Sequence, residues 1–310
     1  MDINTILLAT DFSDASKAGL RKALLFAKRF DATLHIMHAV DKLDSSWYGF
    51  EDAERRAEAL RNAIRQEAQQ MLTNLVPDDT AVEVKTHVSM QLSFDVSATI
   101  VEYANERTID LVVMGTRGHT KRDQFGLGHV ASRVTEKAPC PVLLVGQSAP
   151  WATPGDGGRL SDVVAPIDFS PHSYEAYGYA RSVAAQFGAT LHLLFVAEER
   201  TIPVFSDTGL PGLQTLEMPP AMIENSRNAL QQLIDRTNGP AVEHRIHIKE
   251  GEPAPILIDL IERSGIDLAV IATRGHSALK RMLLGSTTRR LLRRAPCPVL
   301  TLRAGQTKSA

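Results

Sequence analysis

The sequence predicts an α/β fold of two tandem doubly wound domains, each with a five-stranded parallel sheet and helices on both faces. Two observations predict it. The chain repeats itself, and each copy alternates strand patterns with helix patterns. The recurring segments, each displaced by 157 positions, are 6–13 with 163–170, 31–40 with 188–197, 109–119 with 266–276, and 138–143 with 295–300. A constant displacement over four segments indicates a duplicated domain.

The join between the copies is visible in the composition. Residues 147–160, QSAPWATPGDGGRL, are rich in Pro, Gly and Ser and have no hydrophobic period, which is typical of a linker. We therefore expect one domain over residues 1–146 and the other over residues 161–305.

The first half of each copy begins with a buried strand. ILLATD (6–11) is a continuous apolar run, as expected where both faces of a parallel sheet are covered. The next segment, 16–30, places Leu20, Ala23, Leu24 and Ala27 on one helical face. We expect a second strand at 33–40 and a long helix at about 52–75.

The second half of each copy continues the alternation. We expect a third strand at 81–88, a helix at about 95–107 and a fourth strand at 110–114. A glycine-containing loop then leads to a helix near 129–137, and PVLLV (141–145) forms the last strand.

Composition excludes several classes of protein. Hydrophobic residues make up 44% and charged residues 23%, and the formal net charge of −2 gives no basic field for nucleic acid. No apolar run is long enough for a membrane span, and the N-terminus lacks the basic region of a signal peptide. The two cysteines form no disulfide framework. These features indicate a soluble cytoplasmic protein.

The fourth strand of each copy ends in a glycine loop. The motif is Gly115-x2-Gly118, nine residues, then Gly128 in the first copy, and Ala272-x2-Gly275, nine residues, then Gly285 in the second. Ligands of open α/β sheets bind at the carboxyl ends of the strands, and free amides at a helix N-terminus suit a phosphate. Further phosphate contacts are predicted from the guanidinium groups of Arg117 and Arg274 and from a hydroxyl of Ser286 or Thr287.

Asp11 and Asp168 end the first strand of each copy. Either carboxylate, or its adjacent backbone, could accept hydrogen bonds from a nucleobase or a sugar hydroxyl. The alternative is a helix N-cap, since D-F-S precedes the first helix in both copies.

Together, the D-F-S end of the first strand, the G-x2-G-x9-G-(S/T) loop and the closing A-P-C-P-V strand resemble the universal stress protein family, over both halves of the chain. The resemblance implies an adenine-nucleotide site, for ATP, AMP or ADP with Mg²⁺ or Mn²⁺ on the phosphates. Asp11, Asp168, Ala39 and Val196 would meet the base. The remaining contacts implied are Gly115, Gly118, Gly128, His129 and Val130 in the first copy, and Ala272, Gly275, Gly285, Ser286 and Thr287 in the second.

Each copy departs from this pattern at one position. His129 stands where Ser or Thr is expected, so the hydroxyl is lost but the amide remains. Ala272 stands where the first glycine is expected, which costs about 1 kcal/mol only if that position needs φ > 0. We expect the second copy to be the tighter phosphate site, because its Gly-Ser-Thr helix start is complete.

Other polar residues are assigned weaker roles. Lys121-Arg122 and Lys280-Arg281 face either phosphates or solvent, and His119 and His276 shape the loop rather than act as a base. His244 and His247 are three apart in a strand, so they face opposite sides and form no metal site. Cys140 and Cys297 pack beside prolines. No catalytic residue or metal ligand is assigned.

Two features concern architecture beyond the sheets. Residues 198–222 are rich in Pro and Gly, which predicts an irregular excursion, either a lid over the second site or a surface loop. The last strands, PVLLV and PVLTL, are expected to pair within the chain as a pseudo-dimer, and homodimerisation is left open.

The hypotheses for function are three. The first is a nucleotide-binding stress-response regulator without enzymatic activity, the second a slow ATP hydrolase, and the third a nucleotide-free interaction scaffold. The sequence offers binding groups and no convincing general base, so it favours the first. It identifies neither the stress signal nor the downstream protein partner.

Overall fold

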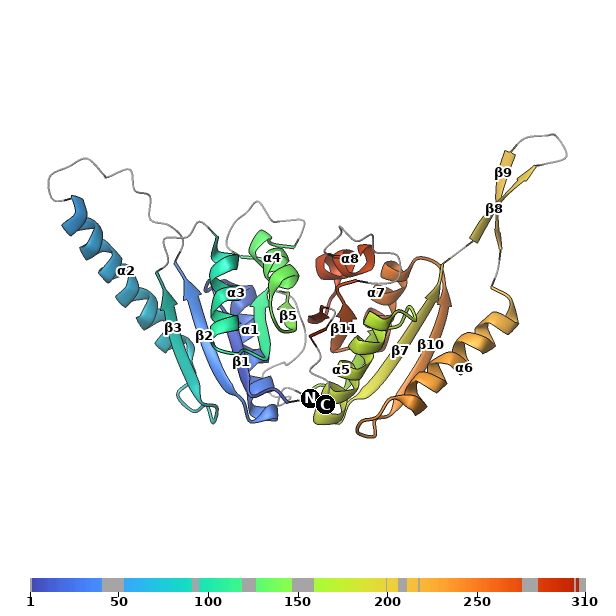
Figure 1. The fold of residues 1–310 in the computed structure, drawn as a ribbon, viewed down its shortest axis with the longest axis horizontal. Helices are drawn as coiled ribbons and strands as arrows, with labels where there is room; N and C mark the ends of the chain where they lie inside the picture. The colour runs from blue at the N-terminus through green and yellow to red at the C-terminus, as the bar shows by residue number, and fades with distance from the viewer. Residues whose placement is uncertain are drawn as a thin grey trace. The chain divides into compact units, whose positions relative to one another are not determined.

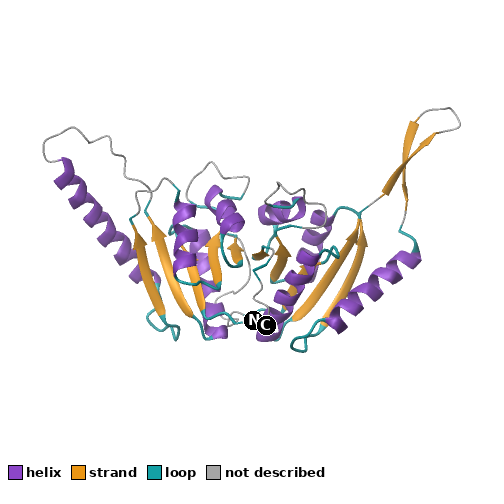
Figure 2. Ribbon diagram, in the orientation of Figure 1, coloured by secondary structure: helices purple, strands orange, loops and turns teal. Residues whose placement is uncertain are grey.

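The structure is a computed structural model, and its fold is drawn in Figure 1. It describes residues 2–40, 53–90, 95–118, 127–146, 159–198, 200–205, 211–216, 218–274, 284–303 and 305–306. The chain divides into two compact units, Met1–Ala152 and Thr153–Ala310. Each unit contributes five parallel strands and has its own helices (Figure 2).

Unit 1 contains a parallel sheet with strand order β3-β2-β1-β4-β5. Its strands are β1 (Thr5–Ala9), β2 (Thr33–Ala39), β3 (Val84–Ser89), β4 (Leu111–Gly115) and β5 (Val142–Val145). Its helices are α1 (Asp14–Phe30), α2 (Ala53–Leu75), α3 (Val96–Glu106) and α4 (His129–Lys137). Helix α1 packs on β1 and β4, α2 packs on β2 and β3, and α3 packs against α4. Right-handed crossovers place α1 and α2 on one face and α3 and α4 on the other.

Unit 2 repeats this arrangement with strand order β10-β7-β6-β11-β12. Its parallel strands are β6 (Asp162–Pro166), β7 (Thr190–Ala197), β10 (His244–Glu250), β11 (Leu268–Ala272) and β12 (Val299–Leu302). Its helices are α5 (Pro171–Phe187), α6 (Pro220–Arg236), α7 (Pro253–Ser264) and α8 (Ser286–Arg294). The predicted α/β fold with two tandem units and parallel sheets is confirmed.

The displacement of 157 positions is kept in the boundaries of the first and last helices of each unit. Helix α5 begins and ends 157 positions after α1, and α8 begins and ends 157 positions after α4. Both first helices have a serine N-cap and a left-handed C-cap, Asp31 (φ 55°) in α1 and Gly188 (φ 69°) in α5. The start of the last helix and the start of the last strand are therefore the same number of residues apart in each unit.

The cores form where apolar strands meet the first helices. Leu7, Val112 and Leu143 on three neighbouring strands of unit 1 are fully buried, as is Phe26 on α1. Burying each such side chain contributes about 1.5–3 kcal/mol to folding. The continuous apolar runs of the sequence therefore correspond to strands covered on both faces.

The excursion of unit 2 differs from its prediction. The irregular conformation expected for residues 198–222 is wrong, because Arg200–Phe205 (β8) and Pro211–Leu216 (β9) form an antiparallel pair. At its end, the Met218 N–H donates to Oε2 of Glu250 at 3.0 Å, which fastens the chain to the end of β10 before α6 begins. The role of the segment as a lid stays a prediction.

Among the residues that the structure describes, no helix combines the length and apolar character needed to cross a bilayer.

Candidate functional site

Each first strand ends in a turn built on an aspartate carboxylate. Oδ1 of Asp11 accepts hydrogen bonds from the Ser13 backbone N–H at 3.1 Å and from the Ser13 hydroxyl at 2.6 Å. Ser13 is itself the N-cap of α1, and its Oγ accepts from the Ser16 N–H at 3.3 Å. Asp168 holds Ser170 in the same way, at 3.0 and 2.5 Å. The N-cap alternative for the aspartates is therefore wrong, because serine caps the helix and aspartate orients the serine.

The residue after each aspartate has a left-handed backbone. Phe12 has φ 64° and Phe169 has φ 60°, a conformation that costs a bulky residue about 1–2 kcal/mol. Each ring contacts an aromatic ring from the second strand, with centroids 4.6 Å apart for Phe12 and His38 and 4.9 Å apart for Phe169 and Phe195. Strain repeated in both units is typical of a functional turn. Neither phenylalanine was predicted from the sequence, although the repeated D-F-S offered a signal.

Hydrogen bonds hold the ends of β1 and β2 side by side. The Thr10 carbonyl lies 2.8 Å from Nδ1 of His38, and the Thr10 hydroxyl accepts from the Phe12 N–H at 3.0 Å. Ala39 is the last residue of β2, and Val196 is the residue before the last of β7. Both residues thus lie at the same sheet edge as the aspartates.

Neither Gly115, the last residue of β4, nor Gly118 has room for a side chain. A Cβ on Gly118 would lie 2.5 Å from Oδ2 of Asp11, so the glycine loop approaches the aspartate directly. A Cβ on Gly115 would lie 3.0 Å from the Cβ of Ala15, and 3.2 Å from both the Ala15 carbonyl carbon and the Arg117 carbonyl oxygen. Neither glycine has a positive φ. Glycine is therefore favoured at these positions by close approach and not by backbone conformation.

Ala272 occupies the position of Gly115 in unit 2. It is 8% exposed and also has no positive φ, so the conformational cost considered for alanine does not arise. Its carbonyl accepts a hydrogen bond from the buried hydroxyl of Thr288 at 2.9 Å. Position 131 of unit 1, which corresponds to Thr288, is alanine. Unit 2 therefore has an additional bond between the end of β11 and the first turn of α8.

A backbone hydrogen bond, which we term the clasp, joins the two glycine elements in each unit. In unit 1 the Gly128 N–H donates to the Thr116 carbonyl at 2.8 Å, and in unit 2 the Gly285 N–H donates to the Thr273 carbonyl at 2.8 Å. The Thr116 N–H in turn donates to Val145 of β5 at 2.9 Å. The clasp brings the start of the last helix to the carboxyl end of the neighbouring strand.

Both helix starts present backbone amides. Gly128 (φ −59°, ψ 148°) and Gly285 (φ −64°, ψ 158°) are the N-caps of α4 and α8, and no described side chain caps either helix. The first intrahelical bond of α4 comes from the Ser132 N–H, so the preceding amides have no acceptor within the helix. These amides belong to His129, Val130 and Ala131 in unit 1 and to Ser286, Thr287 and Thr288 in unit 2.

The remaining predicted loop residues divide into two groups. Arg117 is exposed and Arg274 is half-buried, each one residue after the clasp carbonyl. The others lie outside the described residues, and their roles stay predictions; they are His119, Lys121, Arg122, Gly275, His276, Lys280 and Arg281.

Two predictions about reactive side chains can be compared with the structure. Cys140 and Cys297 are buried, and burial raises the pKa of each thiol to about 12, so neither is a thiolate at neutral pH. Within the described ranges, no group of three or more His, Cys, Asp or Glu side chains could hold a metal ion.

Histidines of unit 2 form a chain that the sequence did not reveal. Nε2 of His192 lies 2.9 Å from Oδ1 of Asp162, and its Nδ1 lies 3.0 Å from Nε2 of His247. His244 lies 3.1 Å from the Tyr177 hydroxyl instead. The two strand histidines therefore do face opposite sides, as predicted. Burial and then the adjacent His192 lower the pKa of His247.

Unit 1 has a related cluster with a tyrosine inserted. Nδ1 of buried His35 lies 3.0 Å from the Tyr103 hydroxyl, and the Tyr103 ring stacks on His87 with centroids 4.9 Å apart. Burial lowers the pKa of both histidines. The residue of unit 2 that corresponds to Tyr103 is Leu260, which has no hydroxyl or aromatic ring. In unit 2 the two histidine rings therefore contact each other directly, whereas in unit 1 Tyr103 lies between them.

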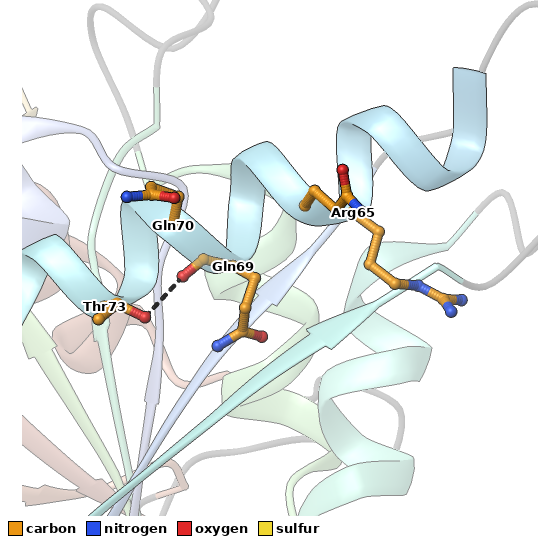
Figure 3. A pocket seen from close by; sticks show the side chains of 5 residues that line it. Arg65, Gln69, Gln70 and Thr73 are labelled. Carbon is orange, nitrogen blue, oxygen red and sulfur yellow. Dashed lines mark hydrogen bonds between the residues drawn. The ribbon is translucent and has the colours of Figure 1, made fainter. Parts of the chain in front are cut away.

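A groove of about 530 Å³ lies along α2 and is shown in Figure 3. Its lining residues are Arg65, Gln66, Gln69, Gln70 and Thr73, and Gln69 donates to the Thr86 hydroxyl at 2.8 Å. None of the residues predicted from the sequence lines this groove, so it is separate from the candidate site.

Relatives of the chain span one unit or both. A universal stress protein of Methanocaldococcus jannaschii is 36% identical over 140 residues, which cover 45% of this chain and 80% of the relative. A universal stress protein of Mycolicibacterium smegmatis is 26% identical over 312 residues, which cover 96% of each chain.

Solved structures of tandem length have the same fold. A universal stress protein from Archaeoglobus fulgidus superposes with a TM-score of 0.63 at 18% identity, covering 98% of this chain and 100% of the other. A functionally unknown protein from Pseudomonas aeruginosa superposes with a TM-score of 0.58 at 17% identity, covering 97% and 92%. The model of the universal stress protein family matches residues 2–146 and 160–303. The chain therefore belongs to the universal stress protein family, with two copies of the family domain in tandem.

Proposed function

We propose that this protein binds an adenine nucleotide, ATP or its AMP and ADP forms, at the carboxyl ends of the parallel strands. The observation that carries the proposal is the clasp between Gly128 and Thr116, with its counterpart between Gly285 and Thr273. It brings uncapped helix amides to the sheet edge where Asp11 and Gly118 meet.

The phosphates fit the helix starts. Backbone amides without helical acceptors, at the positive end of the helix dipole, favour a phosphate. His129 and Val130 would supply amides in unit 1, and Ser286 and Thr287 would supply them in unit 2. Arg117 and Arg274 follow the clasp and would add charge. A bound Mg²⁺ or Mn²⁺ would neutralise part of the phosphate charge.

The base and ribose fit the ends of the first two strands. Asp11 and Asp168 would accept hydrogen bonds from the base, and Ala39 and Val196 would line its apolar side. The narrow approach between Gly118 and Asp11 supports this arrangement, because any side chain at Gly118 would meet the carboxylate.

Unit 2 would be the tighter phosphate site. Its helix start offers the hydroxyls of Ser286 and Thr287, and the bond from Thr288 to Ala272 fixes that start against β11. Ala272 keeps an ordinary backbone conformation, so the alanine adds no conformational strain to unit 2.

The role that follows from this site is regulatory. Binding and release of a nucleotide would change the loops at the sheet edge and thereby the choice of a protein partner during stress. No described side chain is placed as a general base for ATP hydrolysis, and the chemistry leaves room for slow turnover through positioning and charge alone.

Equilibrium dialysis with ATP tests the proposal on protein freed of ligand. We expect Gly285→Val to weaken binding at least about tenfold, because a branched side chain beside the clasp crowds the phosphate position. Gly178→Ala is the matched control, since a Cβ at Gly178 would have no atom within 4 Å. Undiminished binding in Gly285→Val would contradict the proposed phosphate position at the start of α8.

The second candidate is a nucleotide-free interaction scaffold, favoured by the departure of each unit from the full glycine motif at His129 and Ala272. Native mass spectrometry of gently purified protein distinguishes the two. A copurified adenine nucleotide supports the first candidate. A ligand-free protein that also fails to bind added ATP supports the scaffold.

A further inference from the structure

Helix α8 exposes four arginines over its last six residues. Arg289, Arg290, Arg293 and Arg294 are all exposed, whereas Leu291 and Leu292 face the core. Positions i, i+1, i+4 and i+5 lie on one side of a helix, so the four guanidinium groups form a continuous stripe, which we term the arginine face.

The arginine face is electrostatically unfavourable for the isolated helix. Arg289 with Arg293, and Arg290 with Arg294, are like-charged pairs four residues apart, which destabilise a helix. The helix dipole favours positive charge in the last turn, where Arg293 and Arg294 lie, but gives no such support to Arg289 and Arg290. Among the described residues, one ion pair neutralises part of this charge, and it joins Arg290 to Glu252. Exposure to solvent alone does not explain four like charges on a helix of nine residues.

The equivalent helix of unit 1 shows that the fold does not require the arginine face. Helix α4 carries Ser132, Arg133, Glu136 and Lys137 at the same four positions. Arg133 is paired there with Asp95 at 2.8 Å, and the Ser132 hydroxyl lies 3.4 Å from the Glu136 carboxylate. At these four positions α4 carries two basic residues, one acidic residue and one neutral residue, so four like charges are specific to unit 2.

The surrounding sequence extends this asymmetry. From residue 268 to residue 310 the chain contains nine Lys or Arg and no Asp or Glu. The corresponding segment of unit 1, residues 111–153, contains five Lys or Arg and two acidic residues. The excess of positive charge is therefore concentrated in the last part of unit 2, although the whole chain carries a net charge of −2.

We propose that the arginine face of α8 is a docking surface for an acidic polypeptide segment of a partner protein. Guanidinium groups bind carboxylates in a planar, two-point geometry, and Arg is enriched at the energetic centres of protein interfaces. A single-stranded nucleic acid fits less well, because residues 268–310 contain no Phe, Tyr or Trp on which a base could stack. The proposal does not depend on nucleotide binding.

Fluorescence anisotropy with a labelled oligoglutamate peptide tests the proposal on the full chain. Binding by the native protein is expected to weaken as ionic strength rises through about 0.15 M. Reversing charge in Arg293→Glu/Arg294→Glu is expected to weaken binding about tenfold. Lys137→Glu, the substitution at the position of unit 1 equivalent to Arg294, is the matched control and should leave peptide binding unchanged.

A second variant guards against a folding defect. Arg289→Glu creates a favourable Glu–Arg pair with Arg293 four residues later, so α8 is expected to keep its stability in thermal unfolding while peptide binding falls. Retained peptide affinity in both charge-reversed proteins would overturn the proposal. Tighter binding of an oligouridylate than of the peptide would also overturn it, as would loss of ATP binding in Arg293→Glu/Arg294→Glu, which would assign the arginines to the nucleotide site.

Discussion

Units 1 and 2 share their sheet order, their aspartate turns and their clasps, and they differ in the residues placed around these features. Gly115 is replaced by Ala272, His129 by Ser286, and Ala131 by Thr288. The shared features are backbone hydrogen bonds and a strained turn, which the fold must keep to hold a helix start beside the first strand. The variable features are side chains at the end of the fourth strand and in the first turn of the last helix, around the proposed phosphate position. The comparison thus separates the backbone that shapes the proposed site from the side chains that would set its selectivity.

The largest effect on this comparison is expected from Gly115→Ala, which copies the residue of unit 2. Its Cβ would meet the Cβ of Ala15 at 3.0 Å and the Ala15 carbonyl carbon at 3.2 Å. Because backbone yields little, we expect a loss of about 2 kcal/mol in unit 1. Hydrogen–deuterium exchange of the β4 amides measures it, with Ala272→Gly as the reciprocal change. Unaltered protection in Gly115→Ala would mean that the two units have equal room at this position.

The next effect concerns the histidine clusters. Tyr103→Phe removes the hydroxyl that lies 3.0 Å from Nδ1 of buried His35. An unsatisfied buried polar atom costs about 1–3 kcal/mol, so we expect the midpoint of urea unfolding to fall. Tyr174→Phe is the control, since Tyr174 is 40% exposed. If both variants unfold at the same urea concentration as the native protein, the hydrogen bond between Tyr103 and His35 contributes nothing to stability.

A smaller effect is expected from exchanging the helix-start residues. His129→Ser would add a hydroxyl beside the proposed phosphate position of unit 1, and Ser286→His would remove one from unit 2. A single hydrogen bond of about 1 kcal/mol corresponds to about a fivefold change in affinity. Isothermal titration with ATP should therefore show tighter binding in the first variant and weaker binding in the second. Opposite signs would reverse the expected ranking of the two units.

The smallest effect is expected from Gly178→Ala in α5. A Cβ at this position would meet no atom within 4 Å, so the substitution contributes helix propensity alone, about 0.5–1 kcal/mol. Thermal unfolding should shift upward. Gly19→Ala in α1 is the informative companion, because its Cβ would lie 3.4 Å from Leu8. A lower transition temperature in Gly178→Ala would show that the glycine has a role beyond the helix.

The sequence was sufficient for features that depend on local pattern. The duplication, the strand and helix order and the bounds of α4 all follow from periodicity and from the 157-residue displacement. The approach of Gly118 to Asp11 also agrees with the common strand edge expected for both residues.

The sequence was insufficient where contacts join distant elements. The clusters of His35 with Tyr103 and of His192 with His247 depend on strand register and helix placement, which no local pattern reveals. The left-handed Phe12 was missed because aromatic residues rarely adopt that conformation. The β8–β9 pair was missed because its Pro and Gly residues suggested an irregular loop.

The clasp has a practical consequence for engineering. One bond from Gly128 to Thr116 closes the segment between them at its base, so the chain that enters and the chain that leaves are already side by side. Closing a longer segment between fixed ends adds only about 0.6 kcal/mol for each doubling of its length. A reporter peptide inserted between these two residues would therefore begin and end at adjacent, fixed positions, and its length would add little to the free energy of closing the segment.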